Sequence, residues 1–377
     1  MIYLKKFKFR RNLLFIIIFF ILINLNLENR YKYIFANLNN STETQCETNS
    51  IDINNILNEV FDEKDNYILN KDIENLKKFY NLNNKFSNWA YESEVKKINY
   101  LNNWSEKQGI EFKNIKSNII INKVKEKEKG VYSIICTIST RFTYCYSNEL
   151  DCENTFGLGT THYLDLINDN DEWIINKEWY TDPFADCLNL NKLKVNKIRE
   201  FILSQQHPEY TLSDRLEKAI NYAHLYCGAT ISDDSFNYNT NYQNFNAQGG
   251  DCANFASQIL LEGGFKKNST WNYSKGNGTK SWVNAQAFKN YMINSGRANY
   301  ITKGNYEKIY KDAYKLRPGD FVAYEKNGKI THISTVTGLD SKGYPLVTCH
   351  NTDRLLVPYD LGWSNDNIIF HLIHVNY

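Results

Sequence analysis

The stretch that decides the fold covers residues 249–264 and reads Gly249-Gly250-Asp251-Cys252-Ala253-Asn254-Phe255-Ala256-Ser257-Gln258-Ile259-Leu260-Leu261-Glu262-Gly263-Gly264. Phe255 and Ile259 are four residues apart, as on one face of a helix, and Ala256 widens that face. The two glycines before Cys252 allow a tight turn, and Gly263-Gly264 is a stop signal. We therefore expect an apolar helix that begins at Cys252.

Cys252 is the candidate nucleophile because of its place at the start of this helix. Free backbone N–H groups and the positive end of the helix dipole stabilise an anion there, so we expect the thiol pKa to fall. The same N–H groups can bind the oxyanion of a tetrahedral intermediate. The alternative for Cys252 in an exported chain is a disulfide. Cys227 and Cys349 are weaker rival nucleophiles.

Amide cleavage by a thiol also needs a histidine that takes the thiol proton and returns it to the departing amine. Strands are expected at residues 320–325, 329–337, 346–350 and 368–375, after a helix at about 284–295. His332 lies on the second of these strands and is the candidate base. His350 follows one strand later and could orient His332, with Asn351 and Asp353 as competing orienters. A lone histidine on a strand is also commonly structural.

Two tryptophans, Trp271 and Trp282, are candidate substrate-binding residues that flank a loop rich in glycine, serine and lysine. If they are exposed they can stack on sugar rings, and if they are buried they belong to the core. The sequence contains no Cys-x-x-Cys pair, so we expect no structural zinc site and no metal.

The rest of the chain predicts two domains of the α+β class. The chain has 377 residues, 42% of them hydrophobic and 23% charged, which is an ordinary globular balance and excludes collagen, coiled coil and wholesale disorder. Residues 50–188 show helical periodicity first and then, after Gly130, the period of two that is typical of an antiparallel meander. A linker at about residues 189–210 leads to a second domain at residues 211–377, which opens with a helix at about 212–226.

The first 36 residues have the pattern of a signal peptide. A basic segment precedes an apolar run at residues 13–23, which is too short to span a bilayer, and cleavage is expected after Ala36. The alternative is an uncleaved N-terminal anchor. Seven basic side chains against one acidic one give this segment a net charge of +6. The net charge of +2 for the whole chain therefore leaves −4 for the rest, so nucleic-acid binding is not expected. Export also raises the question of disulfides among the eight cysteines, for example between Cys145 and Cys152.

The run at residues 249–264 resembles the signature of the "Putative amidase domain" of secreted Gram-positive proteins. These proteins belong to the wider papain-like group of NlpC-type and CHAP cell-wall cysteine hydrolases. The resemblance covers about 150 residues and includes Trp271, Trp282, Pro318-Gly319-Asp320, His332 and residues 350–354. It implies a papain-like catalytic domain after an accessory domain, whose sheet we expect to be cystatin- or NTF2-like.

In these relatives the cysteine is the nucleophile and the strand histidine is the base, which implies Cys252 and His332 here. NlpC-type enzymes use a histidine as the third group, which favours His350. Some also place a tyrosine near the oxyanion, for which Tyr242 is a candidate, and Gln248 is another in the manner of papain.

We therefore expect a secreted, cell-wall-associated cysteine amidase or peptidase that needs no cofactor. It would cleave amide bonds, in peptidoglycan or a peptide, through a thioester on Cys252, and would have no membrane span after signal cleavage. One alternative is a catalytically inactive wall-binding or adhesion protein on the same fold. Another is an acyl or amide-group transferase, which would share the thioester.

Overall fold

A computed structural model describes residues 52–169, 172–184, 194–232, 234–363 and 367–377. Residues 53–377 form one compact unit, and the account below concerns this unit. The expected signal peptide, Cys46 and Cys187 lie outside the described residues. None of the helices in the described ranges is both long and apolar enough to cross a lipid bilayer.

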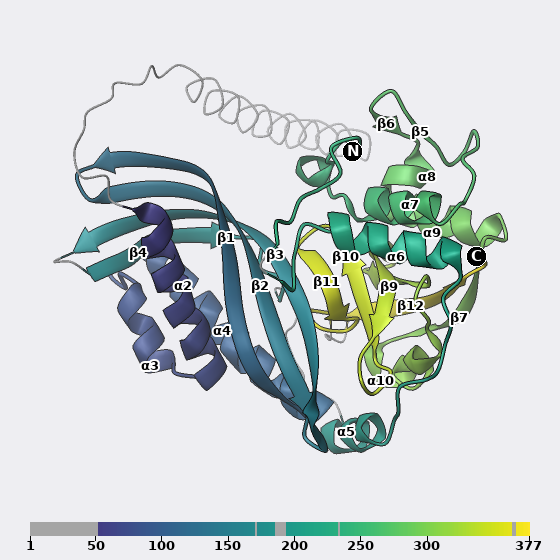
Figure 1. The fold of residues 1–377 in the computed structure, drawn as a ribbon, viewed down its shortest axis with the longest axis horizontal. Helices are drawn as coiled ribbons and strands as arrows, with labels where there is room; N and C mark the ends of the chain where they lie inside the picture. Colours follow the sequence, from purple (N-terminus) through teal and green to yellow (C-terminus); the bar gives the residue numbers. More distant parts are fainter. Residues whose placement is uncertain (1–51, 170–171, 185–193, 233, 364–366) are drawn as a thin grey trace, which may run out of the picture. The chain divides into compact units, whose positions relative to one another are not determined.

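One large antiparallel sheet runs through the unit (Figure 1). Its strands are β1 (Ile110–Glu128), β2 (Val131–Tyr146), β3 (Glu149–Asp169), β4 (Glu172–Tyr180), β7 (Ala298–Gly304), β8 (Phe321–Lys326), β9 (Lys329–Leu339), β10 (Pro345–Cys349), β11 (Asp353–Pro358) and β12 (Ile368–Val375). They lie in the order β1-β2-β3-β11-β10-β9-β8-β12-β7, and β4 pairs with β3 beside this row. A small hairpin, β5 (Tyr273–Ser274) with β6 (Asn277–Gly278), stands apart.

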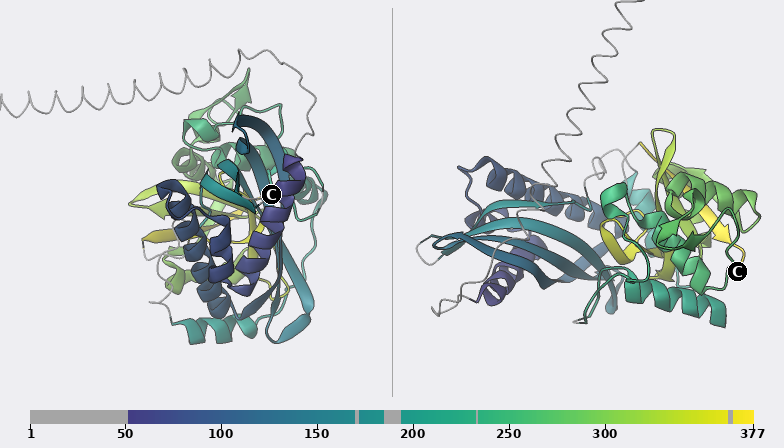
Figure 2. Two further views of the ribbon diagram at one scale, coloured as in Figure 1. Left: turned by 90° about the vertical axis from the view of Figure 1, so that its left-hand side faces the viewer. Right: turned by 90° about the horizontal axis from the view of Figure 1, so that it is seen from above.

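The helices are α2 (Ile53–Asn70), α3 (Ile73–Leu76), α4 (Lys85–Gln108), α5 (Val195–Leu203), α6 (Asp214–Tyr226), α7 (Cys252–Glu262), α8 (Lys280–Val283), α9 (Ala285–Asn294) and α10 (Tyr306–Ile309). Figures 1 and 2 show α2 and α4 along one side of β1–β4. Helices with an antiparallel sheet confirm the predicted α+β class. The domain boundaries and the finer fold names stay predictions.

Strand β3 divides one of its edges between two partners. Gly157, Leu158 and Gly159 pair with β11, whereas the strand from His162 onward pairs with β4. We call the step between Gly159 and His162 the sheet fork. Only glycine fits at positions 157 and 159, because the segment 228–230 crosses the strand closely. A Cβ on Gly157 would lie 2.5 Å from the carbonyl oxygen of Thr230, and a Cβ on Gly159 would lie 2.4 Å from that of Gly228.

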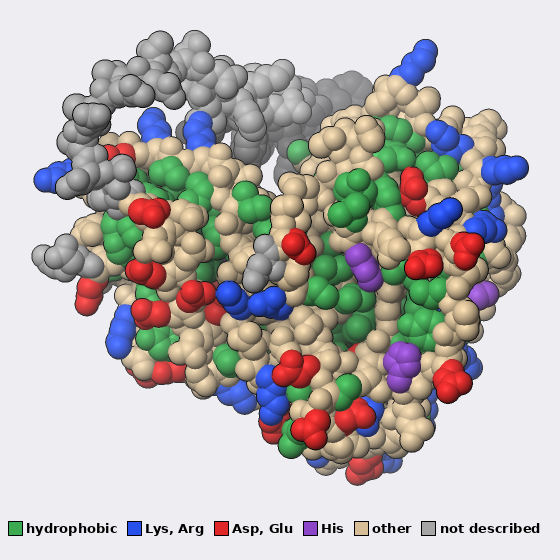
Figure 3. Space-filling view, in the orientation of Figure 1, with side chains coloured by type: hydrophobic (Ala, Val, Ile, Leu, Met, Phe, Trp, Pro, Cys, Tyr) green, Lys and Arg blue, Asp and Glu red, His purple; other side chains and the backbone are tan. Residues whose placement is uncertain are grey.

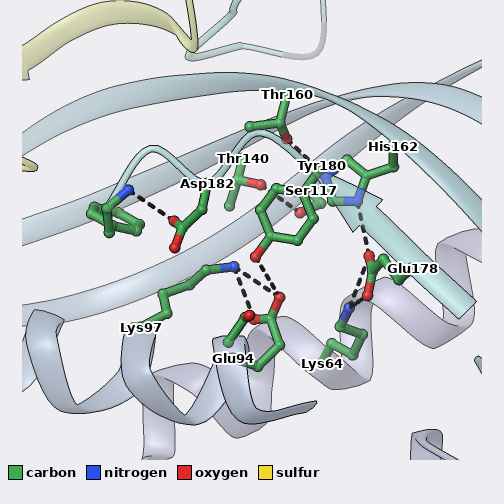
Figure 4. A network of polar contacts seen from close by, with 12 residues as sticks. Lys64, Glu94, Lys97, Ser117, Thr140, Thr160, His162, Glu178, Tyr180 and Asp182 are labelled. Carbon is green, nitrogen blue, oxygen red and sulfur yellow. Dashed lines mark hydrogen bonds and ion pairs between the residues drawn. The ribbon is translucent and has the colours of Figure 1, made fainter. Parts of the chain in front are cut away.

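Buried polar side chains tie the N-terminal helices to β3 and β4 (Figure 4). Lys64 on α2 pairs with Glu178 on β4 at 3.2 Å, and His162 Nδ1 contacts the same carboxylate at 2.8 Å. On α4, Lys97 pairs with Glu94 at 2.8 Å. Buried charges are tolerated when they are paired in this way, because each ion replaces its lost hydration with a partner. The network therefore fixes the helices over the inner face of the sheet.

One buried carboxyl group in this region, that of Asp65, has no ion-pair partner of this kind within the described part of the chain. Asp65 is 4% exposed and lines a cavity of about 40 Å³ with Lys64, Glu94 and His162. Its Oδ2 atom has no hydrogen-bond partner among the described residues. Burial raises the pKa of the Asp65 carboxyl to about 7, although Ser117 donates to it and two lysines are near.

The described surface in Figure 3 mixes the two signs of charge. Lys and Arg side chains alternate with Asp and Glu over the face drawn there, without a broad basic area among the described residues on that face. This distribution gives no support for a nucleic-acid footprint on that face.

Candidate active site

The turn before Cys252 requires its two glycines. Gly249 has φ +105° and Gly250 has φ +122°, values that side-chain-bearing residues rarely adopt. A Cβ on Gly250 would lie 2.2 Å from Nδ2 of Asn351. The Oδ1 atom of the same Asn351 accepts a hydrogen bond from the backbone N–H of Asp251. The loop after β10 therefore shapes the entry into α7.

His350 holds the start of α7 in place and does not contact the ring of His332. Its Nδ1 lies 2.5 Å from Asp251 Oδ2, and its Nε2 donates to the carbonyl oxygen of Tyr226 at 2.8 Å. Its ring is stacked between those of Tyr238 and Phe255, with both centroid distances at 3.7 Å. Both ring nitrogens are thus engaged away from His332. The expected contact from His350 to His332 is absent among the described residues, and the geometry gives His350 a positioning role.

Cys252 begins α7 as expected, with its side chain buried. The residue is 5% exposed, and it packs in one apolar cluster with Ile333 of β9. Burial raises the pKa of the Cys252 thiol to about 11, while backbone hydrogen bonds with Ile333 and Ala253 lower it. The expected lowering below the ordinary value is therefore wrong, because desolvation outweighs the helix start.

His332 lies on β9 beside a second thiol. Its Nε2 is 3.2 Å from Sγ of Cys349, and its ring stacks on that of Trp363 at 5.2 Å. Burial, with a smaller effect from the positive charge of Arg354, lowers the pKa of His332 to about 3. The imidazole is therefore neutral at physiological pH and able to accept a proton.

His332 contacts the thiol of Cys349, and the thiol of Cys252 lies near enough to Cys349 to affect its pKa. Burial raises the pKa of Cys349 to about 12, although the positive charge of Arg354 and a hydrogen bond from Ser334 act to lower it. Cys349, ranked below Cys252 from sequence, is thus the sulfur that the structure places in hydrogen-bond contact with His332. The structure places Cys252 against Ile333, the next residue of the same strand.

His332 lines a cleft of about 1010 Å³ that opens at the sheet fork. Gly249 and Gly250 from the turn, Asn351 and Asp353 from the loop and β11, and Trp363 also line it. Further lining residues come from β3 and β4, which belong to the first predicted domain, and from the segment 228–247 before the glycine turn. The cleft is thus made by residues from both halves of the chain.

The remaining predicted residues have clear places. Asp353 lines the cleft and accepts a hydrogen bond from the Tyr238 hydroxyl, and burial raises the pKa of its carboxyl to about 7. Gln248 is exposed in the short 3-10 helix before the glycines. Tyr242 is half-buried and stacks on Trp282. Neither Tyr242 nor Gln248 lines the cleft.

Trp271 and Trp282 are fully buried, which corrects the expectation that they offer a stacking surface. Trp271 Nε1 donates to Ser257 at 2.9 Å and Trp282 Nε1 donates to Asn254 at 2.8 Å. Both partners lie on α7, so these tryptophans support the helix that carries Cys252.

Sequence reasoning missed three side chains that define the site. Tyr238 stacks on His350, Trp363 stacks on His332, and the guanidinium of Arg354 donates to the carbonyl oxygens of Leu361 and Pro183. Arg354 lies in the quoted run 350–354, but Tyr238 and Trp363 sit in irregular segments that carry no periodic signal.

Within the described ranges, no three His, Cys, Asp or Glu side chains come together as a metal-binding group. Cys136, Cys145, Cys152, Cys227, Cys252 and Cys349 are free thiols. The suggested clip between Cys145 and Cys152 is therefore wrong.

Comparisons with known proteins point to the same part of the chain. Residues 213–373 match the family model described as "Putative amidase domain". The uncharacterized protein YjcM of Bacillus subtilis (strain 168) is 32% identical over 139 residues, which are 34% of this chain and 30% of YjcM. The match thus spans less than a third of that relative's length, and no solved structure matches the chain. The segment that contains Cys252, His332 and His350 is therefore similar to an amidase family.

Proposed function

We propose that this protein is an exported cysteine amidase or peptidase that cleaves an amide bond in bacterial peptidoglycan. The observation that carries the proposal is His332, which lines the cleft and contacts Cys349, within the same amidase-like segment that places Cys252 at the start of α7. Cys252 itself does not line the cleft. The signal-like N-terminus supports export.

Cys252 is the proposed nucleophile, with His332 as its base. Its thiol receives backbone hydrogen bonds at a helix start, where an oxyanion can also be bound, whereas Cys349 is 1% exposed at the end of a strand. The resting pair is neutral, since the thiol pKa is raised and that of His332 is lowered. In this proposal the imidazole of His332 first rotates away from Cys349. The proton then moves from the Cys252 thiol to His332 as the sulfur attacks the carbonyl carbon.

In the rest of the cycle, His332 passes one proton to the departing amine and takes another from the attacking water. The sulfur forms a bond to the carbonyl carbon, and the carbon–nitrogen bond breaks as the imidazolium gives its proton to the departing amine. Water then loses a proton to His332 and attacks the thioester, which releases the acid and restores the thiol. Asp251, His350 and Asn351 keep the start of α7 in position throughout.

The test compares single thiol replacements in the full chain on purified peptidoglycan. Cys252→Ala should abolish release of new amine and carboxyl ends, and the Cys252 peptide of the parent should carry a trapped acyl group by mass spectrometry. Cys136→Ala is the matched control, because it removes a fully buried thiol from β2 far along the chain. Undiminished release by Cys252→Ala contradicts the proposal, and an acyl group found on Cys349 moves the nucleophile there.

A further inference from the structure

Two large aromatic side chains are exposed on a wall of the same cleft. Tyr163 of β3 and Trp179 of β4 are directly paired across the two strands, and their ring centroids are 5.6 Å apart. Tyr163 is 49% exposed and Trp179 is 62% exposed. Both line the cleft that also contains His332. Exposed aromatic pairs of this size are a common mark of a binding surface.

The pair stands on the outer face of the sheet, away from the buried network. The next pair in the register, His162 with Tyr180, points to the inner face, where His162 contacts Glu178 and Tyr180 donates to Glu94. Side chains alternate between faces along a strand, so burying one pair in the network leaves Tyr163 and Trp179 on the other face. Thr137 and Thr161, themselves a cross-strand pair, also line the cleft beside them.

The polar groups around the aromatic pair are mostly neutral. Hydroxyl and amide side chains line the cleft, among them Thr137 and Thr161 beside the pair, and Asn237 and Asn244 from the segment before the glycine turn. Its ionisable side chains are of both signs, Lys326 and Arg354 against Asp182 and Asp353, and burial raises the pKa of both carboxyls. Such a lining does not select a strongly charged polymer. It suits a ligand with an apolar ring face and many hydroxyl or amide groups.

The geometry points to a sugar-binding subsite formed by Tyr163 and Trp179, which holds a neutral, N-acetylated sugar ring of a glycan strand. The C–H face of the ring packs on the indole of Trp179, and its hydroxyl and acetamido groups hydrogen-bond to the threonine and asparagine side chains. The cleft, at about 1010 Å³, has room for more than one ring. This inference rests on the proposed function, because the glycan held by Tyr163 and Trp179 is taken to carry the amide bond that is cleaved near His332 in the same cleft.

Binding is tested in a Cys252→Ala background, so that turnover does not interfere. Soluble β-1,4-linked N-acetylglucosamine tetramer is titrated into the full chain and the heat of binding is measured. We expect Trp179→Ala to raise the Kd about tenfold and Tyr163→Ala to raise it by less, whereas Trp179→Phe keeps most of the affinity because it retains a flat ring. Trp89→Ala is the control, since Trp89 is 50% exposed on α4 and does not line the cleft.

Several results overturn the subsite. They are absence of tetramer binding, equal affinity in Trp179→Ala and its parent, or an equal loss in Trp89→Ala. Preferential binding of a peptide without sugar, lost in Trp179→Ala, makes the pair a peptide site instead.

Hydrolysis separates this inference from the proposed function. With Cys252 intact, Trp179→Ala should raise KM for intact peptidoglycan and leave kcat within about twofold, with no change on a peptide amide that carries no sugar. If Cys252→Ala cleaves normally while the tetramer still binds through Trp179, the proposed nucleophile fails and the subsite stands. If KM for peptidoglycan is unchanged in Trp179→Ala, the subsite fails and the nucleophile is unaffected.

Discussion

The pH dependence of Cys252 deprotonation tests whether Cys252 and His332 are neutral in the free protein or already form an ion pair. Burial at 5% exposure raises the thiol pKa from 9.0 to about 11. At pH 8 the thiolate fraction is then roughly one in a thousand, against roughly one in ten for the ordinary thiol, a difference of about 100-fold. A neutral Cys252 is also consistent with a neutral His332, whose pKa is lowered to about 3.

The assay is alkylation of the full chain by iodoacetamide between pH 6 and 10, with the Cys252 peptide followed by mass spectrometry. Because burial slows the reaction at every pH, the inflection of the profile is the readout rather than the absolute rate. We expect the rate to rise tenfold per pH unit up to pH 10 without a plateau. The urea-unfolded chain provides the reference inflection. His332→Ala should leave the inflection unchanged, since a neutral imidazole stabilises no thiolate. A plateau below pH 8 that His332→Ala abolishes would refute the reasoning and show a preformed ion pair.

Three further predictions concern stability. Asp65→Asn should stabilise the fold by about 4 kcal/mol at pH 8, because the carboxyl pKa is raised from 3.8 to about 7 and its ionisation opposes folding. This gain in stability should fade as the pH drops from 7 to 4, because the Asp65 carboxyl is then protonated in the folded protein. Urea unfolding at pH 8 and at pH 4 checks this, and an equal gain at pH 4 contradicts it. Gly250→Ala should cost at least about 2 kcal/mol and most activity, since strain at φ +122° adds to a clash with Asn351. Gly249→Ala meets strain without a clash and should cost less; the reverse order in thermal melts counts against this account. Trp271→Ala should cost about 3–5 kcal/mol by emptying a fully buried site, while its folded fraction still binds the N-acetylglucosamine tetramer; loss of that binding would restore a sugar role for Trp271.

Local periodicity predicted those parts of the fold that depend on neighbours in sequence. The period of two after Gly130 corresponds to β2 at Val131–Tyr146, and the glycine pair with its apolar run corresponds to α7 starting at Cys252. The pairing of β3 with β11 joins residues nearly 200 positions apart, as in Gly159 with Asp353, and no local pattern specifies it. The cleft depends on that pairing, so its walls could not be assigned from sequence.

Trp179 shows why the exposed aromatic was missed. Ile175 is fully buried, and strict alternation along β4 would bury Trp179 on the same face. The register shifts between the pairs Asp165–Lys177 and Leu166–Ile175, so the bulged strand changes face and Trp179 becomes exposed. A bulge depends on the partner strand and is therefore hard to predict from one segment. Likewise, the thiol pKa of Cys252 was misjudged because its burial arises from packing on β9.

The sheet fork has a practical consequence for anyone who expresses the amidase-like segment alone. Residues 213–373 begin after β3, so such a fragment would lose the strand that pairs with Asp353, Arg354 and Leu355 of β11. Its sheet would then end in an uncovered edge, whose unpaired backbone groups can recruit another copy of the fragment. We would expect a shortened protein to self-associate and to lack one side of the cleft that His332 lines, even with Cys252 and His332 intact.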